Sequence, residues 1–341
     1  MINCIKKFLP LMLSMIFLIA GCGSESDSAK QRQVVIAMQS VPNDEMIARS
    51  WYDKEIGEAL GVKLVKLNYD SSLLIGNAMA TGNIDIAIVG SAEAAHIISQ
   101  DQSCEIFWIH NIEGENEALV VKKNSGINSL AELKGKRIAV TFGATVHYSL
   151  LQAMKLVGLS TDDAMLFDLQ PPEIIDAWHK GEIDAAFLWQ PALGDLIRDG
   201  RVLFNSRQLD AMGITTADVG IVRKEFARHN PDILKRYIEL LANADEMYIN
   251  QPEHAASIAA KNLQTTVDEA RNQMDELVWI GADEQLSERY LGTSKRKGQF
   301  VQTLIETAHF LERNDLIDRA ASDETFENAV NPSYVEAIFN K

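Results

Sequence analysis

The chain has 341 residues, of which 47% are hydrophobic and 23% charged, so it can form two compact domains and is neither disordered nor fibrous. It contains 32 Lys and Arg residues against 48 Asp and Glu residues, which gives a net charge of −16 at pH 7. Such an acidic surface repels phosphate backbones, so nucleic acid is excluded as a partner.

The N-terminus has the features of a processing signal. Two lysines precede an apolar run at 8–21 that is too short to span a bilayer comfortably. The run ends in LIAGC at 18–22, the Leu-x-small-small-Cys pattern of a bacterial lipoprotein signal, although an ordinary signal peptide with a nearby Cys also fits. The Ser-rich polar stretch at 22–32 is typical of a tether and favours the lipoprotein interpretation. We therefore expect residues 1–21 to be removed and Cys22 to be acylated and held at a membrane.

The other cysteines predict neither a disulfide nor a metal site. Cys4 is removed with the signal, and Cys104 then remains as the one free thiol, which we interpret as a small buried hydrophobic residue. The seven histidines are scattered along the chain and do not form a Cys/His cluster with metal-ligand spacing. We therefore expect no metal and no other cofactor.

Short strands and helices alternate through the first 192 residues. The first half predicts a strand at 33–39, a helix at 44–61, a strand at 62–69, a helix at 71–82 and a strand at 83–90. The second half predicts a strand at 135–143, a helix at 144–158, a strand at 164–170, a helix at 171–181 and a strand at 182–192. This alternation indicates parallel sheets, and therefore two α/β lobes of similar plan.

The last strand of each half begins with the same residues. Gly82, Ile84, Asp85 and Ala87 recur 99 residues later as Gly181, Ile183, Asp184 and Ala186. Each lobe therefore contributes an equivalent strand, and polar or aromatic residues follow at its end.

Two further strand-like runs, at 117–123 and 218–224, end in basic residues and predict the crossings between the lobes. The remainder, 225–341, is strongly helical and is expected to pack on the first lobe. The boundaries that we predict are 33–117 together with 225–341 for lobe one, and 118–224 for lobe two. Because the carboxyl ends of the strands of both lobes then meet in one cleft, this organisation predicts a solute-binding protein that closes on its ligand.

Four blocks, at 115–123, 135–151, 168–193 and 215–227, resemble the substrate-binding proteins of taurine importers of the ABC class. The elements HYSLL and LQPPEII within them are the most specific. The resemblance implies a two-lobed periplasmic-binding-protein fold of type II, with two crossing strands as its hinge and no catalytic activity. It also implies a monomer in the cell envelope that delivers taurine, or a close aminosulfonate, to an ABC permease and its ATPase. With the lipid anchor, the protein would face the periplasm or the outer side of the cytoplasmic membrane.

Taurine has a sulfonate at one end and an ammonium at the other. The start of a helix suits a sulfonate because its free N–H groups and positive dipole end point outwards. Thr145, His147 and Tyr148 open the predicted helix at 144–158, and Ser91 lies in the loop after the equivalent strand of lobe one. On the residues alone Thr145 would only cap its helix and His147 would be a surface or core residue. With the resemblance, we expect all four to contact the ligand.

Three other residues are expected in the cleft. Trp189 ends the last strand of lobe two, where its ring can cover the ethylene group or meet the ammonium, although core packing would also explain it. Asp218 lies at the second crossing, and the resemblance implies that it takes the amino group, the alternative being a turn residue. Gln39 follows the first strand as a neutral donor or a solvated loop residue.

Glu93 and the ligand remain open points. Residues 90–93 read GSAE where the family pattern resembles GSSP, and a carboxylate near a sulfonate is unfavourable unless it points away or meets a cation. We expect Glu93 to lie in the first turn of the next helix, where acidic residues are common. The solute could instead be an alkanesulfonate, an aminoethylphosphonate or a pyrimidine precursor of thiamine. A desulfinase-like enzyme of the same fold would need a cysteine nucleophile, and neither Cys22 nor Cys104 lies in a motif with a base.

Overall fold

The computed structural model describes residues 32–69, 75–101 and 103–339. The chain divides into a unit of residues 1–31 and a unit of residues 32–341, and everything below concerns the second. The predicted signal segment and Cys22 lie outside the described residues.

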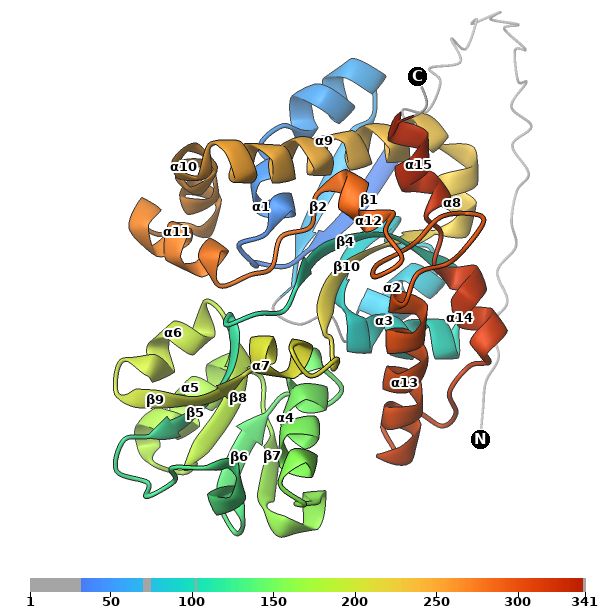
Figure 1. Ribbon diagram of the computed structural model, residues 1–341. Coiled ribbons are helices and arrows are strands. Elements are labelled where there is room, and N and C mark those ends of the chain that lie inside the picture. Colours follow the sequence, from blue (N-terminus) through green and yellow to red (C-terminus); the bar gives the residue numbers. More distant parts are fainter. Residues whose placement is uncertain (1–31, 70–74, 102, 340–341) are drawn as a thin grey trace, which may run out of the picture. The chain divides into compact units, whose positions relative to one another are not determined.

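Two five-stranded sheets, one in each lobe, confirm the α/β class and the two lobes that the sequence predicted (Figure 1). In lobe one the order is β2-β1-β3-β10-β4, with bounds β1 (Gln33–Met38), β2 (Lys63–Asn68), β3 (Ile86–Gly90), β4 (Cys104–Ile112) and β10 (Ala217–Arg223). In lobe two the order is β7-β6-β8-β5-β9, with bounds β5 (Glu117–Lys122), β6 (Arg137–Val140), β7 (Met165–Asp168), β8 (Ala185–Trp189) and β9 (Gly200–Asn205).

The two sheets have the same plan. In each, the three strands at one edge run parallel, and the fourth runs antiparallel to both of its neighbours. The fourth strand of lobe one is β10, although the sequence analysis placed 218–224 in lobe two. The chain therefore returns to lobe one before Ala217 and not after 224. A strand run that ends in basic residues has the same pattern in either sheet, so sequence alone did not locate this crossing.

Helices cover both sheets. The early helices of lobe one are α1 (Asp44–Ala48), the π-helical η1 (Asp53–Glu58), α2 (Ile75–Ala80) and α3 (Ser91–Gln100). Those of lobe two are η3 (Leu130–Leu133), α4 (Thr145–Leu156), η4 (Thr161–Asp163), α5 (Pro171–Lys180), α6 (Ala192–Ile197) and α7 (Ser206–Asp210). The helix predicted over 44–61 is therefore two shorter helices, although Met46 and Ile56 are both fully buried in the same core.

The C-terminal part of the chain adds helices α8 (Lys224–His229), α9 (Pro231–Asn250), α10 (Pro252–Leu263), α11 (Val267–Asp275), α12 (Ala282–Gln285), α13 (Phe300–Arg313), α14 (Asp323–Ala329) and α15 (Ser333–Phe339). Their apolar faces join the core of lobe one, in which Phe107, Tyr237 and Phe326 are fully buried. One helix of this region, α13, also extends alongside α3.

Two of the residues repeated between the lobes, Asp85 and Asp184, hold neighbouring strands together. The backbone N–H of Val35 donates to the Asp85 carboxylate over 3.0 Å, and the backbone N–H of Arg137 donates to the Asp184 carboxylate over the same distance. Each carboxylate therefore ties the segment that enters the last parallel strand to the neighbouring strand. Gly181, which ends α5, has φ of 74°, a left-handed conformation that glycine adopts without strain.

The crossings between the lobes rest against a third segment of lobe one. Ile112 pairs with Val278, and the backbone N–H of Glu115 donates to the carbonyl oxygen of Glu276 over 2.9 Å. A Cβ atom at Gly114 would collide with that same carbonyl oxygen, so glycine is required for this close approach. The hinge is therefore supported on one side by packed backbone.

Candidate ligand-binding cleft

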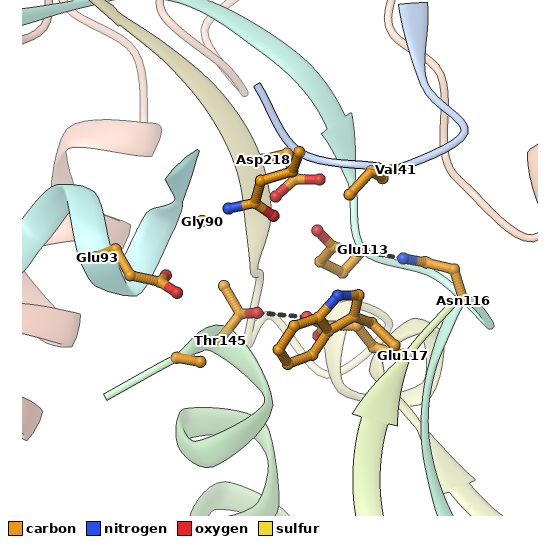
Figure 2. A pocket seen from close by; sticks show the side chains of 11 residues that line it. Val41, Gly90, Glu93, Glu113, Asn116, Glu117, Thr145 and Asp218 are labelled. Carbon is orange, nitrogen blue, oxygen red and sulfur yellow. Dashed lines mark hydrogen bonds between the residues drawn. The ribbon is translucent and has the colours of Figure 1, made fainter. Parts of the chain in front are cut away.

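A narrow cavity lies between the lobes, where β3 and β8 end and β10, α3 and α4 begin (Figure 2). Lobe one contributes the loop after β1, the start of α3 and the start of β10. Lobe two contributes the start of α4 and the end of β8, and the crossing between the lobes supplies the rest. The lining residues are Gln39, Val41, Gly90, Glu93, Glu113, Asn116, Glu117, Ala144, Thr145, Trp189 and Asp218.

Four residues predicted from the sequence meet in this cavity: Gln39, Thr145, Trp189 and Asp218. Ser91 is not among the lining residues. It is fully buried, and its Oγ accepts a hydrogen bond of 3.3 Å from the backbone N–H of Ala217.

His147 and Tyr148 also do not line the cavity. The His147 ring stacks on Phe142 with centroids 4.3 Å apart, and its Nδ1 accepts from the backbone N–H of Gly143 over 3.2 Å. Phe310 of α13 meets Tyr148 edge to face with centroids 4.8 Å apart and also approaches His147. These two side chains therefore form an aromatic contact between the lobes. Burial lowers the pKa of His147 to about 4, so the ring is neutral near pH 7.

Four carboxylate side chains line the cavity: Glu93, Glu113, Glu117 and Asp218. Each belongs to a residue that is at most 6% exposed. Lys, Arg and His are absent from the described residues that line it. Glu93 lies in the first turn of α3, as expected, and it also lines the cavity (Figure 2). Because α3 begins directly at the cavity, its first turn presents Glu93 to it.

Glu117 connects the crossing to lobe two. The Thr145 hydroxyl donates to one of its carboxylate oxygens and the Ser206 hydroxyl donates to the other, the latter over 2.9 Å. Burial raises the pKa of Glu117 to about 8 despite these hydrogen bonds. In the register of the sheet Glu117 faces Trp189, so both are fixed by the pairing of β5 with β8.

Glu113 and Asp218 are the two acidic residues that line the cavity beside the end of β4 and the start of β10. Burial, together with the charges of Asp218 and Glu117, raises the pKa of Glu113 well above its ordinary value. The amide nitrogen of Asn116 donates to the Glu113 carboxylate, while its oxygen accepts from the backbone N–H of Gly114 over 2.7 Å. Burial raises the pKa of Asp218 to about 6, although the nearby His110 opposes this shift.

A buried polar network inside lobe one lies next to these acidic residues. Asp44 accepts hydrogen bonds of 2.6 Å from the Trp108 indole N–H and from the His110 ring. Burial alone would lower the pKa of His110, but the charge of Asp44 raises it above its ordinary value. Arg49 donates to the carbonyl oxygen of Gln39 over 3.0 Å and so holds the loop that lines the cavity.

Two helix N-termini meet at the cavity from opposite lobes. The residues that precede α3 and α4, Gly90 and Ala144, have extended backbones and both line the cavity. The first N–H groups of a helix have no partner within the helix and carry a partial positive charge. An ideal Cβ at Gly90 would lie 2.9 Å from the Thr145 Cγ2, so the two N-termini are in close contact. The cavity thus combines a carboxylate-rich wall with a site suited to an anion.

The sequence analysis missed Glu113, Asn116 and Glu117. They belong to the run EGENE at 113–117, immediately before the strand that was predicted as the first crossing. Acidic residues beside a glycine at a crossing between lobes are a signal that could have marked them.

Two kinds of feature were not found among the described residues. The part of the chain that the structure describes has no helix long and apolar enough to cross a membrane. Within the same residues no group of three or more His, Cys, Asp or Glu side chains is arranged to hold a metal ion.

Known proteins share this architecture. The crystal structure of the periplasmic aliphatic sulphonate binding protein from Escherichia coli superposes with a TM-score of 0.72 at 17% identity, covering 89% of this chain and 99% of that one. The taurine-binding periplasmic protein of Escherichia coli (strain K12) is 32% identical over 313 residues, which are 90% of this chain and 94% of the relative. A putative aliphatic sulfonates-binding protein of Bacillus subtilis (strain 168) is 27% identical over 328 residues, 92% of each chain.

A family model described as the substrate binding domain of the ABC-type glycine betaine transport system matches residues 32–283, which span both lobes. These likenesses establish the periplasmic-binding-protein fold that the resemblance implied. The chain therefore belongs to this family of substrate-binding domains of ABC-type transport systems.

Proposed function

We propose that the protein binds taurine, or a close aminosulfonate, in the cleft and delivers it to an ABC permease and its ATPase. One observation carries the proposal: buried carboxylates and two helix N-termini converge on a single interlobe cavity. A small molecule with a cation at one end and a monoanion at the other matches both parts. The 32% identity to a taurine-binding protein supports the choice of a sulfonate as the anion.

The ammonium of the ligand pairs with Asp218, assisted by Glu113 and Glu117. The sulfonate accepts hydrogen bonds at the starts of α3 and α4, and Trp189 covers the ethylene group between the two ends. An alkanesulfonate without the amine would leave the buried Asp218 without a cationic partner, which is how such a site discriminates.

Binding without catalysis is the better interpretation of the cleft. Cys104 lies at the start of β4, does not line the cavity, and is 1% exposed. Burial raises the pKa of its thiol to about 11, which suppresses the nucleophilic thiolate. The described lining residues therefore supply ligand contacts and no cysteine nucleophile.

The envelope location belongs to the proposal as well. Cleavage before Cys22, acylation of its thiol and a tether up to residue 32 would anchor a monomer beside the permease. Mass spectrometry of the protein from a bacterial host should show an acylated N-terminal cysteine, and Cys22→Ser should release the protein from the membrane fraction. Retention of the full signal segment in the unaltered protein would contradict this.

Calorimetric titration tests the ligand. We expect taurine to bind more tightly than ethanesulfonate, aminoethylphosphonate or glycine betaine, since only taurine combines a primary ammonium with a monoanionic sulfonate. Asp218→Asn should weaken taurine binding by about 2–5 kcal/mol, the range for removing one partner of a buried charge pair. Asp176→Asn is the matched control, because Asp176 pairs with Lys180 on the exposed face of α5. Equal affinity for ethanesulfonate and taurine would refute the role of the acids.

A further inference from the structure

A second, larger chamber adjoins the ligand cavity. It has a volume of about 290 Å³, against about 20 Å³ for the narrow inner cavity. The two share Gln39, Val41 and Trp189 as a common wall. A group attached to a ligand in the inner cavity would therefore enter this chamber by passing between these three side chains.

The chamber differs from the inner cavity in chemistry. Its walls are mainly apolar, with Val41 from lobe one and Pro172, Ile175 and Trp189 from lobe two. Tyr69 adds a half-buried aromatic side chain from lobe one, and Asp195 is the one ionisable acid or base other than Tyr69 among the described lining residues. Such walls favour an uncharged hydrocarbon group over a second anion or a peptide.

We propose that this chamber receives an apolar substituent carried on the ligand's nitrogen, so that the protein also takes up N-substituted aminosulfonates. The inference rests on the proposed function and extends its substrate class. Alkylation leaves the amine cationic, so it keeps its attraction to Asp218 and Glu113. Val41 belongs to the same cavity wall as these two acids and also borders the chamber (Figure 2). A substituent on the nitrogen therefore has a short route outwards past Val41, whereas the helix N-termini enclose the sulfonate.

Two ligands and two variants test the proposal. The ligands are taurine and N-cyclohexyl-2-aminoethanesulfonate, each titrated by calorimetry. In Ile175→Trp the larger ring fills the chamber from α5. We expect it to lower the affinity for the N-cyclohexyl compound at least tenfold and to change the affinity for taurine less than twofold. The control is Ile197→Trp, which places the same side chain at the exposed end of α6, outside both cavities, and should change neither affinity.

The outcomes separate the two proposals. If taurine fails to bind the unaltered protein, the proposed function itself fails. If taurine binds but the N-cyclohexyl compound does not, the chamber takes no substituent and the inference is overturned. It is also overturned if Ile175→Trp weakens both ligands equally or weakens neither. Should thermal melting show that Ile175→Trp is unfolded, Ile175→Ser replaces it. This variant removes an apolar side chain from the chamber without adding volume, and it should again lower only the affinity for the N-cyclohexyl compound.

Discussion

Replacing Gly90 with alanine adds one methyl group where the two lobes meet. The backbone of Gly90 has φ of −66° and ψ of 156°, which alanine adopts without strain, so the effect is purely steric. The new Cβ would lie 2.9 Å from the Cγ2 of Thr145 in lobe two and would also collide with the Glu93 carboxylate. When the lobes separate, Thr145 moves away and leaves room for the Glu93 side chain to shift. The substitution should therefore oppose closure and leave the open form intact.

The magnitude follows from the cost of overpacking. One additional methyl group in a packed contact costs about 1–3 kcal/mol, which corresponds to a rise in the dissociation constant for taurine of roughly 5- to 150-fold. The free energy of unfolding should change by less than about 1 kcal/mol, since the ligand-free protein can relax by opening.

Calorimetry with taurine and guanidinium denaturation measure these two quantities. The matched control is Gly57→Ala in η1, where the new Cβ would meet nothing closer than 3.6 Å. The reasoning is refuted if Gly90→Ala binds taurine within twofold of the unaltered protein. It is equally refuted if stability falls as much as affinity, because the methyl group would then disturb lobe one itself.

Other consequences can be checked independently. The ammonium of taurine favours ionised acids, and the pKa values of Glu117 and Asp218 are raised to about 8 and about 6. Binding should therefore release protons, and affinity should rise from pH 5 to pH 8; titrations in buffers of different ionisation enthalpy measure this, and an unchanged affinity would contradict it. For stability the sign is reversed. A raised carboxyl pKa means that the folded state holds more protons than the unfolded state, so the contribution of Glu117 falls as pH rises from about 4.5 to 8. Urea melts at pH 5 and pH 8 should show a smaller pH dependence in Glu117→Gln, and an identical dependence would count against the buried carboxyl. Phe310→Leu removes the aromatic contact with α4, worth about 0.5–1.5 kcal/mol, and should raise the taurine dissociation constant about two- to tenfold; no change would show that this contact does not assist closure. Asp184→Ala should lower the free energy of unfolding by about 1–3 kcal/mol while taurine affinity stays constant, and a loss of affinity in the folded variant would show that the brace also shapes the cleft.

Much of the architecture could be predicted from local pattern. The alternation of strands and helices predicted both lobes. Strand ends located Gln39 and Trp189, whereas Thr145 and Asp218 were expected in the cleft from the family resemblance, and all four line the cavity. The repeated aspartates marked equivalent strands, but their side chains hold neighbouring strands together and are not among the residues that line the cavity. The sequence repeat therefore identified residues that hold the sheets together, and it did not identify the residues that line the cavity.

The remaining residues depend on how one lobe faces the other, which sequence does not encode locally. Successive residues in a helical turn point in directions about 100° apart. Thr145 therefore faces the cavity, whereas His147 and Tyr148 face Phe310, more than 150 positions later in the chain. The same argument applies to Glu93, because whether the first turn of α3 meets solvent or the cleft depends on where lobe two lies.

The acidic lining also determines which molecules the cleft does not bind. Mineral oxyanions such as sulfate and hydrogen phosphate share the tetrahedral oxygens of a sulfonate, but they are dianions and lack an amine. The described lining residues include no Lys, Arg or His to neutralise a dianion, and Asp218, whose pKa is about 6, is ionised at pH 7 and repels it. An importer supplied by this protein would therefore continue to collect carbon-bound sulfur in a medium rich in inorganic salts, since those salts would not compete for the receptor.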